Sequence, residues 1–96
     1  MKNRFFAVVN PAAGGGRSGK LAGDALTRLR QAGLSVDVIA STGPRHAVQL
    51  AQEAYLQGFR KFLAVGGDGT AHEIINGVFA ATSSPERIAL GFLPLG

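Results

Sequence analysis

At positions 62–70 the chain reads Phe-Leu-Ala-Val-Gly-Gly-Asp-Gly-Thr, so that a short apolar run opens directly into a glycine-rich turn. A continuous apolar run of this length, bounded by glycine, is typical of a strand buried on both faces of a parallel sheet. The segment from Ala71 to about Ala81 follows as a helix. The stretch therefore predicts a strand at 62–65, a turn at 66–70 and a helix, the unit from which parallel α/β sheets are built.

The same alternation extends toward both ends of the chain. Gly33 and Gly58 stand where left-handed C-terminal helix caps belong, and Thr42-Gly43-Pro44 offers a capping hydroxyl before a proline suited to a first helical turn. Strands are expected at residues 5–9, 34–40, 62–65 and 88–93, and helices at residues 18–32, 44–57 and 71–81. This order requires crossover connections, so we expect one α/β domain with a mostly parallel sheet, right-handed crossovers and helices on both faces.

Composition places the chain among globular proteins. Of its 96 residues, 46% are hydrophobic and 17% are charged, and none is cysteine. Disulfides and thiolate metal sites are thereby excluded, and a reducing cytoplasm is the expected location. The apolar run at 5–9 is too short for a signal peptide, and no stretch approaches the length of a membrane span, so no transmembrane segment is expected.

The net charge of +4 is spread along the chain, which suits an anionic ligand or an anionic membrane surface. Nucleic acid is not an expected partner, because the sequence has no basic stripe interleaved with aromatic residues and no recognised nucleic-acid-binding motif.

The turn at 66–70 carries the main candidate site. Its three glycines allow positive φ and close backbone approach, and its amides, with the positive end of the following helix, predict a phosphate site. Asp68 beside phosphate calls for a cation, and Mg²⁺ is the natural one. In the alternative, Asp68 is a turn residue and Thr70 with Glu73 is a capping box that satisfies the helix amides. Gly77 inside the helix predicts a close packing contact there.

The first glycine loop, residues 10–19, fits three patterns. Gly14 to Gly19 matches a dinucleotide fingerprint, but four residues separate it from the strand, and Asp37 falls inside the second strand instead of at its end. Gly14 to Lys20 matches a phosphate-binding loop without the hydroxyl that should follow the lysine. The third pattern is a rigid Asn10-Pro11 turn whose amide side chain can bond the backbone or a nucleotide.

These motifs together resemble the diacylglycerol kinase and sphingosine kinase family, specifically its soluble bacterial lipid kinases. The resemblance spans the chain and rests on Asn10-Pro11-Ala12-Ala13-Gly14, Thr42, the Gly66–Thr70 turn, Glu73 and Asn76-Gly77. The turn alone is also similar to NAD kinases and phosphofructokinases, so the early Asn-Pro loop and the Asn76-Gly77 pair discriminate. His72 departs from the family pattern, which places asparagine or an apolar residue there.

The resemblance implies ATP- and Mg²⁺-dependent phosphoryl transfer to a lipid hydroxyl such as that of diacylglycerol, with Asp68 as the candidate catalytic and metal-binding residue. It implies that the nucleotide contacts residues of three segments: Asn10, Pro11, Gly14, Thr42, Gly66, Gly67, Asp68, Gly69, Thr70, Ala71, His72 and Glu73. It also implies a lipid substrate met at the inner face of the membrane, with which the protein associates peripherally, and it is compatible with a homodimer.

Residues 1–96 would then be the N-terminal ATP-binding domain, inactive alone, because the family's β-rich second domain carries the proposed general base. An NAD kinase, a sugar-phosphate kinase and a non-catalytic nucleotide-binding module remain the alternatives at this point.

Overall fold

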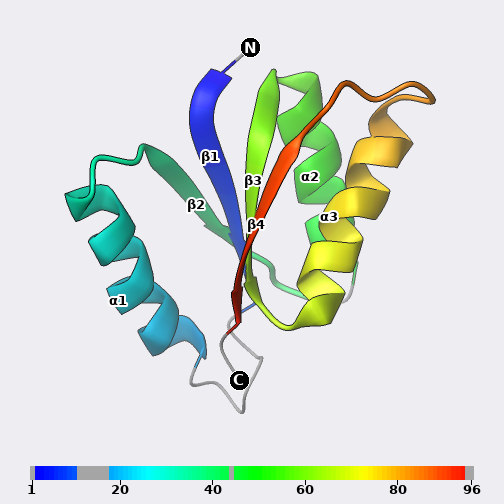
Figure 1. Ribbon diagram of the computed structural model, residues 1–96. Coiled ribbons are helices and arrows are strands. Elements are labelled where there is room, and N and C mark those ends of the chain that lie inside the picture. The colour runs from blue at the N-terminus through cyan, green and yellow to red at the C-terminus, as the bar shows by residue number, and fades with distance from the viewer. Residues whose placement is uncertain (1, 11–17, 44, 95–96) are drawn as a thin grey trace.

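The computed structural model describes residues 2–10, 18–43 and 45–94, which form strands and helices in strict alternation (Figure 1). In chain order the elements are β1 (Lys2–Val9), α1 (Ser18–Gln31), β2 (Val36–Ala40), α2 (His46–Leu56), β3 (Phe59–Gly66), α3 (Asp68–Ala81) and β4 (Ala89–Pro94). The predicted order of four strands and three helices is confirmed.

The four strands form one sheet in the order β2-β1-β3-β4, and every neighbouring pair is parallel. In Figure 1 the strands accordingly run toward the same end of the sheet. Parallel pairing confirms the expectation drawn from the crossover connections. It also brings the residues that follow β1, β2 and β3 to a single edge, the carboxyl edge.

Helices cover both faces of the sheet, as predicted. On one face, Ala7 and Val65 pack with Leu26 of α1. On the other, Val8 and Phe62 pack with buried residues of α2 and α3, and Val8 and Phe62 have no exposed surface. Because side chains alternate along a strand, β1 and β3 serve both cores with neighbouring residues.

The contact between α2 and α3 depends on Gly77. A methyl group at this position would lie 2.4 Å from the carbonyl oxygen of Val48 and 2.7 Å from Cβ of Ala51. The two helices therefore approach at a distance that only glycine permits, which confirms the close contact expected at Gly77.

Three strands begin two or three residues away from the expected start. β1 begins at Lys2 instead of Phe5, and the other two differences have identifiable reasons. Gly33 has φ +94, and the amide of Leu34 donates to the carbonyl of Leu29 at 3.1 Å. Leu34 therefore belongs to the C-terminal cap of α1, and β2 begins at Val36 instead of Leu34. At the other boundary, β3 begins at Phe59, directly after Gly58 with φ +107. Phe59 is buried and packs edge-on against Phe6, so the strand starts three residues earlier than predicted.

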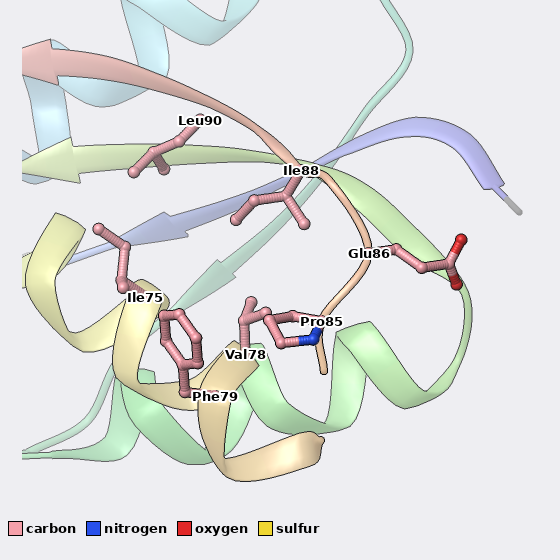
Figure 2. Close-up of a pocket in the computed structure, with 7 residues that line it drawn as sticks. All are labelled: Ile75, Val78, Phe79, Pro85, Glu86, Ile88 and Leu90. Atoms are coloured by element: carbon pink, nitrogen blue, oxygen red, sulfur yellow. The ribbon is translucent and has the colours of Figure 1, made fainter. Parts of the chain in front are cut away.

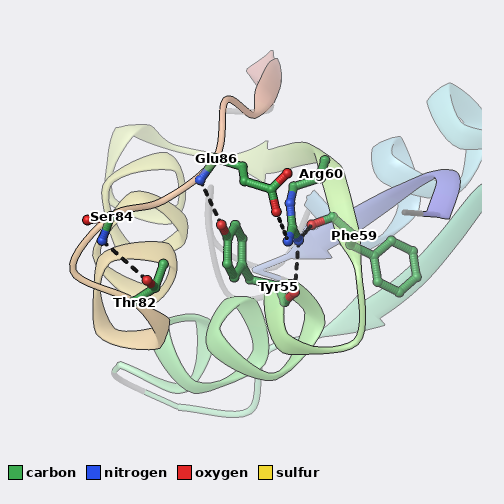
Figure 3. A network of polar contacts seen from close by, with 6 residues as sticks. All are labelled: Tyr55, Phe59, Arg60, Thr82, Ser84 and Glu86. Atoms are coloured by element: carbon green, nitrogen blue, oxygen red, sulfur yellow. Dashed lines mark hydrogen bonds and ion pairs between the residues drawn. The ribbon is translucent and has the colours of Figure 1, made fainter.

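A polar network joins α2, β3 and the connection between α3 and β4 at the amino end of β3 (Figure 3). The guanidinium of Arg60 lies 3.7 Å from the centre of the Tyr55 ring and donates to Glu86 Oε1 at 2.8 Å. The amide of Glu86 in turn donates to the Tyr55 hydroxyl at 2.7 Å. These contacts fix the chain that leads from α3 into β4.

Candidate functional site

The candidate site lies at the carboxyl edge, where the ends of β1, β2 and β3 are held together by backbone hydrogen bonds. The amide of Asn10 donates to the carbonyl of Val65 at 3.1 Å, and the amide of Ser41 donates to the carbonyl of Val9 at 2.8 Å. Asn10, Thr42 and the Gly66 turn therefore follow three adjacent strands, as their predicted shared role requires. Open α/β sheets bind ligands at this edge.

The turn between β3 and α3 is much shorter than predicted. Gly66 still belongs to β3, Gly67 is the N-cap, and α3 begins at Asp68 instead of Ala71. Only Gly66 has positive φ, at +144, whereas Gly67 is extended with φ −100. Gly67 alone links β3 to α3, so the expected five-residue turn is wrong.

This short turn changes which amides can meet an anion. The amide of Thr70 donates to the carbonyl of Gly67 at 3.2 Å and is already used. Asp68 and Gly69 occupy the first helical turn, where an amide has no partner four residues earlier in the helix. Gly67, Asp68 and Gly69 are all exposed, so the open helix start at the end of β3 consists of these residues.

The predicted capping box does not form. Gly67 is the N-cap and, within the described residues, no side chain caps this helix. Thr70 is the third residue of the helix and only 3% exposed, so it belongs to the packing beneath the site. The structure thus removes the capping explanation for Thr70 and Glu73.

Asp68 is the acidic residue in the first turn of α3, where its charge is favoured by the positive end of the helix dipole. Its side chain is exposed. In the described part of the chain no group of three or more His, Cys, Asp or Glu side chains could hold a metal ion. A cation at Asp68 would therefore need ligand oxygens from phosphate and water, which fits Mg²⁺ bound together with a nucleotide.

The remaining predicted residues of α3 lie farther into the helix. Ala71 packs against the core shared with α2, Glu73 is half-buried, and His72 is exposed. The helix places these three in its first and second turns, behind Asp68 and Gly69.

Thr42 does not open α2 as predicted. The helix begins at His46, and its N-cap is Arg45 with φ +66, a left-handed conformation that its sequence did not suggest. Thr42 instead contacts the first helical residue: its amide donates to Nδ1 of His46 at 2.9 Å, and its hydroxyl lies 3.1 Å from the same nitrogen. Sequence reasoning missed His46, because a histidine four residues after a threonine is too common a pattern to mark a site.

Pro11 and Gly14 lie outside the described residues, so their predicted roles stay predictions. Asn10 is half-buried at the end of β1. Asp37, the acidic residue that a dinucleotide fold would need, lies inside β2 as expected and accepts a hydrogen bond from Nε of Arg4 at 3.1 Å. That hydrogen bond, with the charge of Asp37, raises the pKa of Arg4. Asp37 is therefore engaged away from the carboxyl edge.

None of the helices in the described residues has the length and apolar character needed to cross a bilayer.

The comparisons with known proteins all indicate the same family. The model of the diacylglycerol kinase catalytic domain matches residues 4–96. A diacylglycerol kinase of Staphylococcus aureus (strain bovine RF122 / ET3-1) is 31% identical over 96 residues, which is 100% of this chain and 30% of that protein. A diacylglycerol kinase of Staphylococcus saprophyticus shows the same identity and coverage.

Solved structures agree on the fold. A diacylglycerol kinase from Bacillus anthracis aligns with a TM-score of 0.66 at 25% identity, covering 98% of this chain and 33% of that one. A second Bacillus anthracis structure, of a candidate diacylglycerol kinase, aligns with a TM-score of 0.79 at 24% identity, with the same coverage. The chain thus spans about a third of the length of the proteins it resembles.

Proposed function

Because this chain belongs to the diacylglycerol kinase catalytic domain family, we propose that it supplies the ATP-binding part of a lipid kinase. The family supports kinase activity in general, and it disfavours the NAD kinase and phosphofructokinase alternatives that share the glycine-rich turn. The observation that carries the proposal is the start of α3, where Asp68 and Gly69 open a helix directly at the end of β3.

Phosphoryl transfer depends mainly on positioning and on neutralising charge on the transferred group. In this proposal the first amides of α3 receive a phosphate of ATP, since a helix start combines unpaired N–H groups with a favourable dipole. Asp68 is the residue that would hold Mg²⁺, and the ion would neutralise phosphate charge. Asn10 and Thr42 flank the nucleotide from the neighbouring strands.

The acceptor is proposed to be the hydroxyl of a lipid such as diacylglycerol, met at the cytoplasmic surface of a membrane. The net charge of +4 is compatible with an anionic surface. Since the chain spans 30% of its curated relatives, we assign the lipid site and the general base to polypeptide outside residues 1–96. The 96 residues alone should bind nucleotide without transferring phosphate.

Thermal unfolding with ATP, in the presence and absence of Mg²⁺, tests the proposal. A ligand that binds only the folded state at ~100 times its Kd adds ~2.7 kcal/mol of stability, which is several degrees in Tm. The shift should be larger with Mg²⁺ than without it.

The variant Asp68→Asn tests the role of the carboxylate. It should reduce the extra shift that Mg²⁺ provides without weakening the binding of free ATP, because a neutral amide is a weaker ligand for the ion than a carboxylate and does not repel phosphate. Glu53→Gln, an exposed carboxylate on α2, is the matched control and should behave as wild type. No shift with millimolar ATP in any form of the protein would refute the proposed function.

A further inference from the structure

An apolar groove of about 310 Å³ lies between α3 and β4, apart from the carboxyl edge (Figure 2). Ile75, Val78 and Phe79 of α3 form one wall, and Ile88 and Leu90 form the other. Phe79 is 60% exposed, and Ile75 and Leu90 are each 37% exposed. Contiguous exposed apolar surface of this kind marks an interaction site more often than ordinary surface.

The groove continues the core that α2 and α3 cover. Leu90 pairs with Phe62, and Phe92 pairs with Ala64, so both β4 side chains point to the face on which Phe62 and Ala64 are fully buried. Phe92 is nevertheless 40% exposed. The sheet therefore extends one strand beyond the cover that α3 provides.

The topology of the sheet indicates which kind of element would cover the exposed side chains of β4. In the described residues β4 is an edge strand, and the connections of the sheet from β2 through α2, β3 and α3 to β4 advance in one direction on one face. A parallel strand added beside β4 by a right-handed crossover would place its helix on that same face. That helix would lie beside α3, over Leu90 and Phe92.

The rim of the groove is fixed in advance. Pro85 and Glu86 border it, and Glu86 is held by Arg60 and by the Tyr55 hydroxyl. This rim is therefore already ordered before a partner binds, which lowers the entropic cost of association.

We infer that this groove binds an amphipathic helix. The helix would come from polypeptide equivalent to the two thirds of the relatives' length that this chain does not span. The inference rests on family membership, on the apolar walls and on the crossover geometry, and it does not depend on nucleotide binding. The groove between α3 and β4 can accept a row of apolar side chains from a helix, because such rows pack into grooves on a neighbouring surface.

The test uses the isotope-labelled 96-residue chain and synthetic peptides that tile the unmatched two thirds of the Staphylococcus aureus relative. We expect one tile to bind saturably and to shift the backbone NMR signals of Ile75, Phe79 and Leu90. Phe79→Asp should weaken that binding at least tenfold. Leu56→Asp is the matched control, because Leu56 is 66% exposed and lies outside the groove, and it should leave the Kd unchanged.

Both substituted side chains are largely exposed, so the variants should fold, and Phe79→Gln provides a milder second variant. The inference is overturned if no tile binds, if the shifted signals lie outside the groove, or if Leu56→Asp weakens binding as much as Phe79→Asp. It is also overturned if the groove instead mediates self-association by sedimentation, or binding to diacylglycerol-containing vesicles, with the same dependence on Phe79.

Discussion

The variant Gly77→Ala tests the packing that joins α2 to α3. Ordinary contacts of a Cβ atom begin at 3.4 Å, whereas the new methyl would lie 2.4 Å from the carbonyl oxygen of Val48, 1.0 Å too close. It would also lie 3.0 Å from the amide nitrogen of Gln52. Two of the obstructing atoms are backbone atoms of a helix, so relief requires the helices to separate.

The expected magnitude follows from two opposing effects. Replacing a helical glycine by alanine gains ~1 kcal/mol of intrinsic stability. Overpacking costs about 1–3 kcal/mol, and backbone obstruction favours the upper end of that range. The net destabilisation should be about 2 kcal/mol, which lowers the Tm of a chain of this size by roughly 8–16 °C.

Urea unfolding followed by circular dichroism measures this change, and Gly23→Ala is the control. Gly23 is also inside a helix, but nothing lies within 4 Å of the position where its Cβ would be. That variant should therefore gain up to about 1 kcal/mol. If Gly77→Ala were as stable as the wild-type chain, the close approach of α2 and α3 would be disproved.

Two further predictions concern the turn into α3 and the network at the other end of the sheet. Gly66→Ala should destabilise the chain by about 1–3 kcal/mol, because φ +144 is strained for alanine. Gly67→Ala, at an extended position with open space around its Cβ, should cost no more than about 1 kcal/mol. Equal urea midpoints for the two variants would contradict the backbone conformation assigned to Gly66. The hydrogen bond and the charge of Arg60 lower the pKa of Glu86, so this pair stabilises the fold above the unfolded pKa of glutamate and loses its effect as pH falls through the folded pKa. The difference in urea midpoint between wild type and Glu86→Gln should therefore be present at about pH 7 and shrink between about pH 5 and 3, and a difference independent of pH would argue against the pair.

Much of the fold follows from local sequence. Short, largely apolar segments predicted the four strands, and the alternation of strands and helices predicted the parallel sheet. Gly33 and Gly58 end their helices with positive φ, as expected. These features depend on residues close together in the chain, which is why the sequence alone was sufficient to predict them.

Boundaries set by tertiary contacts were not predictable in this way. The run Gly66 to Thr70 reads as a loop because glycine disfavours helix, yet α3 already includes Asp68 and Gly69, and of the three glycines only Gly66 has a positive φ. Arg45 adopts a left-handed conformation that residue type alone does not suggest. The bond between Arg60 and Glu86 joins residues 26 positions apart, and no local pattern marks it.

The candidate site, too, was predictable from the sequence only in part. Topology alone placed the Asn10 loop and the Gly66 turn at the carboxyl edge, because both follow strands of a parallel sheet, whereas Thr42 was expected there only from the family resemblance. The contact of His46 with Thr42 and the burial of Thr70 needed side-chain positions in three dimensions.

The proposed nucleotide site is tested most directly by titrating the labelled chain with ATP and Mg²⁺ and mapping the amide signals that move. The largest changes should occur at Asp68 and Gly69, with smaller ones at Asn10 and Thr42, and Asp68→Asn should reduce them only when Mg²⁺ is present. Changes centred on Arg4 and Asp37 at the opposite end of the sheet, or no saturable change, would contradict the account.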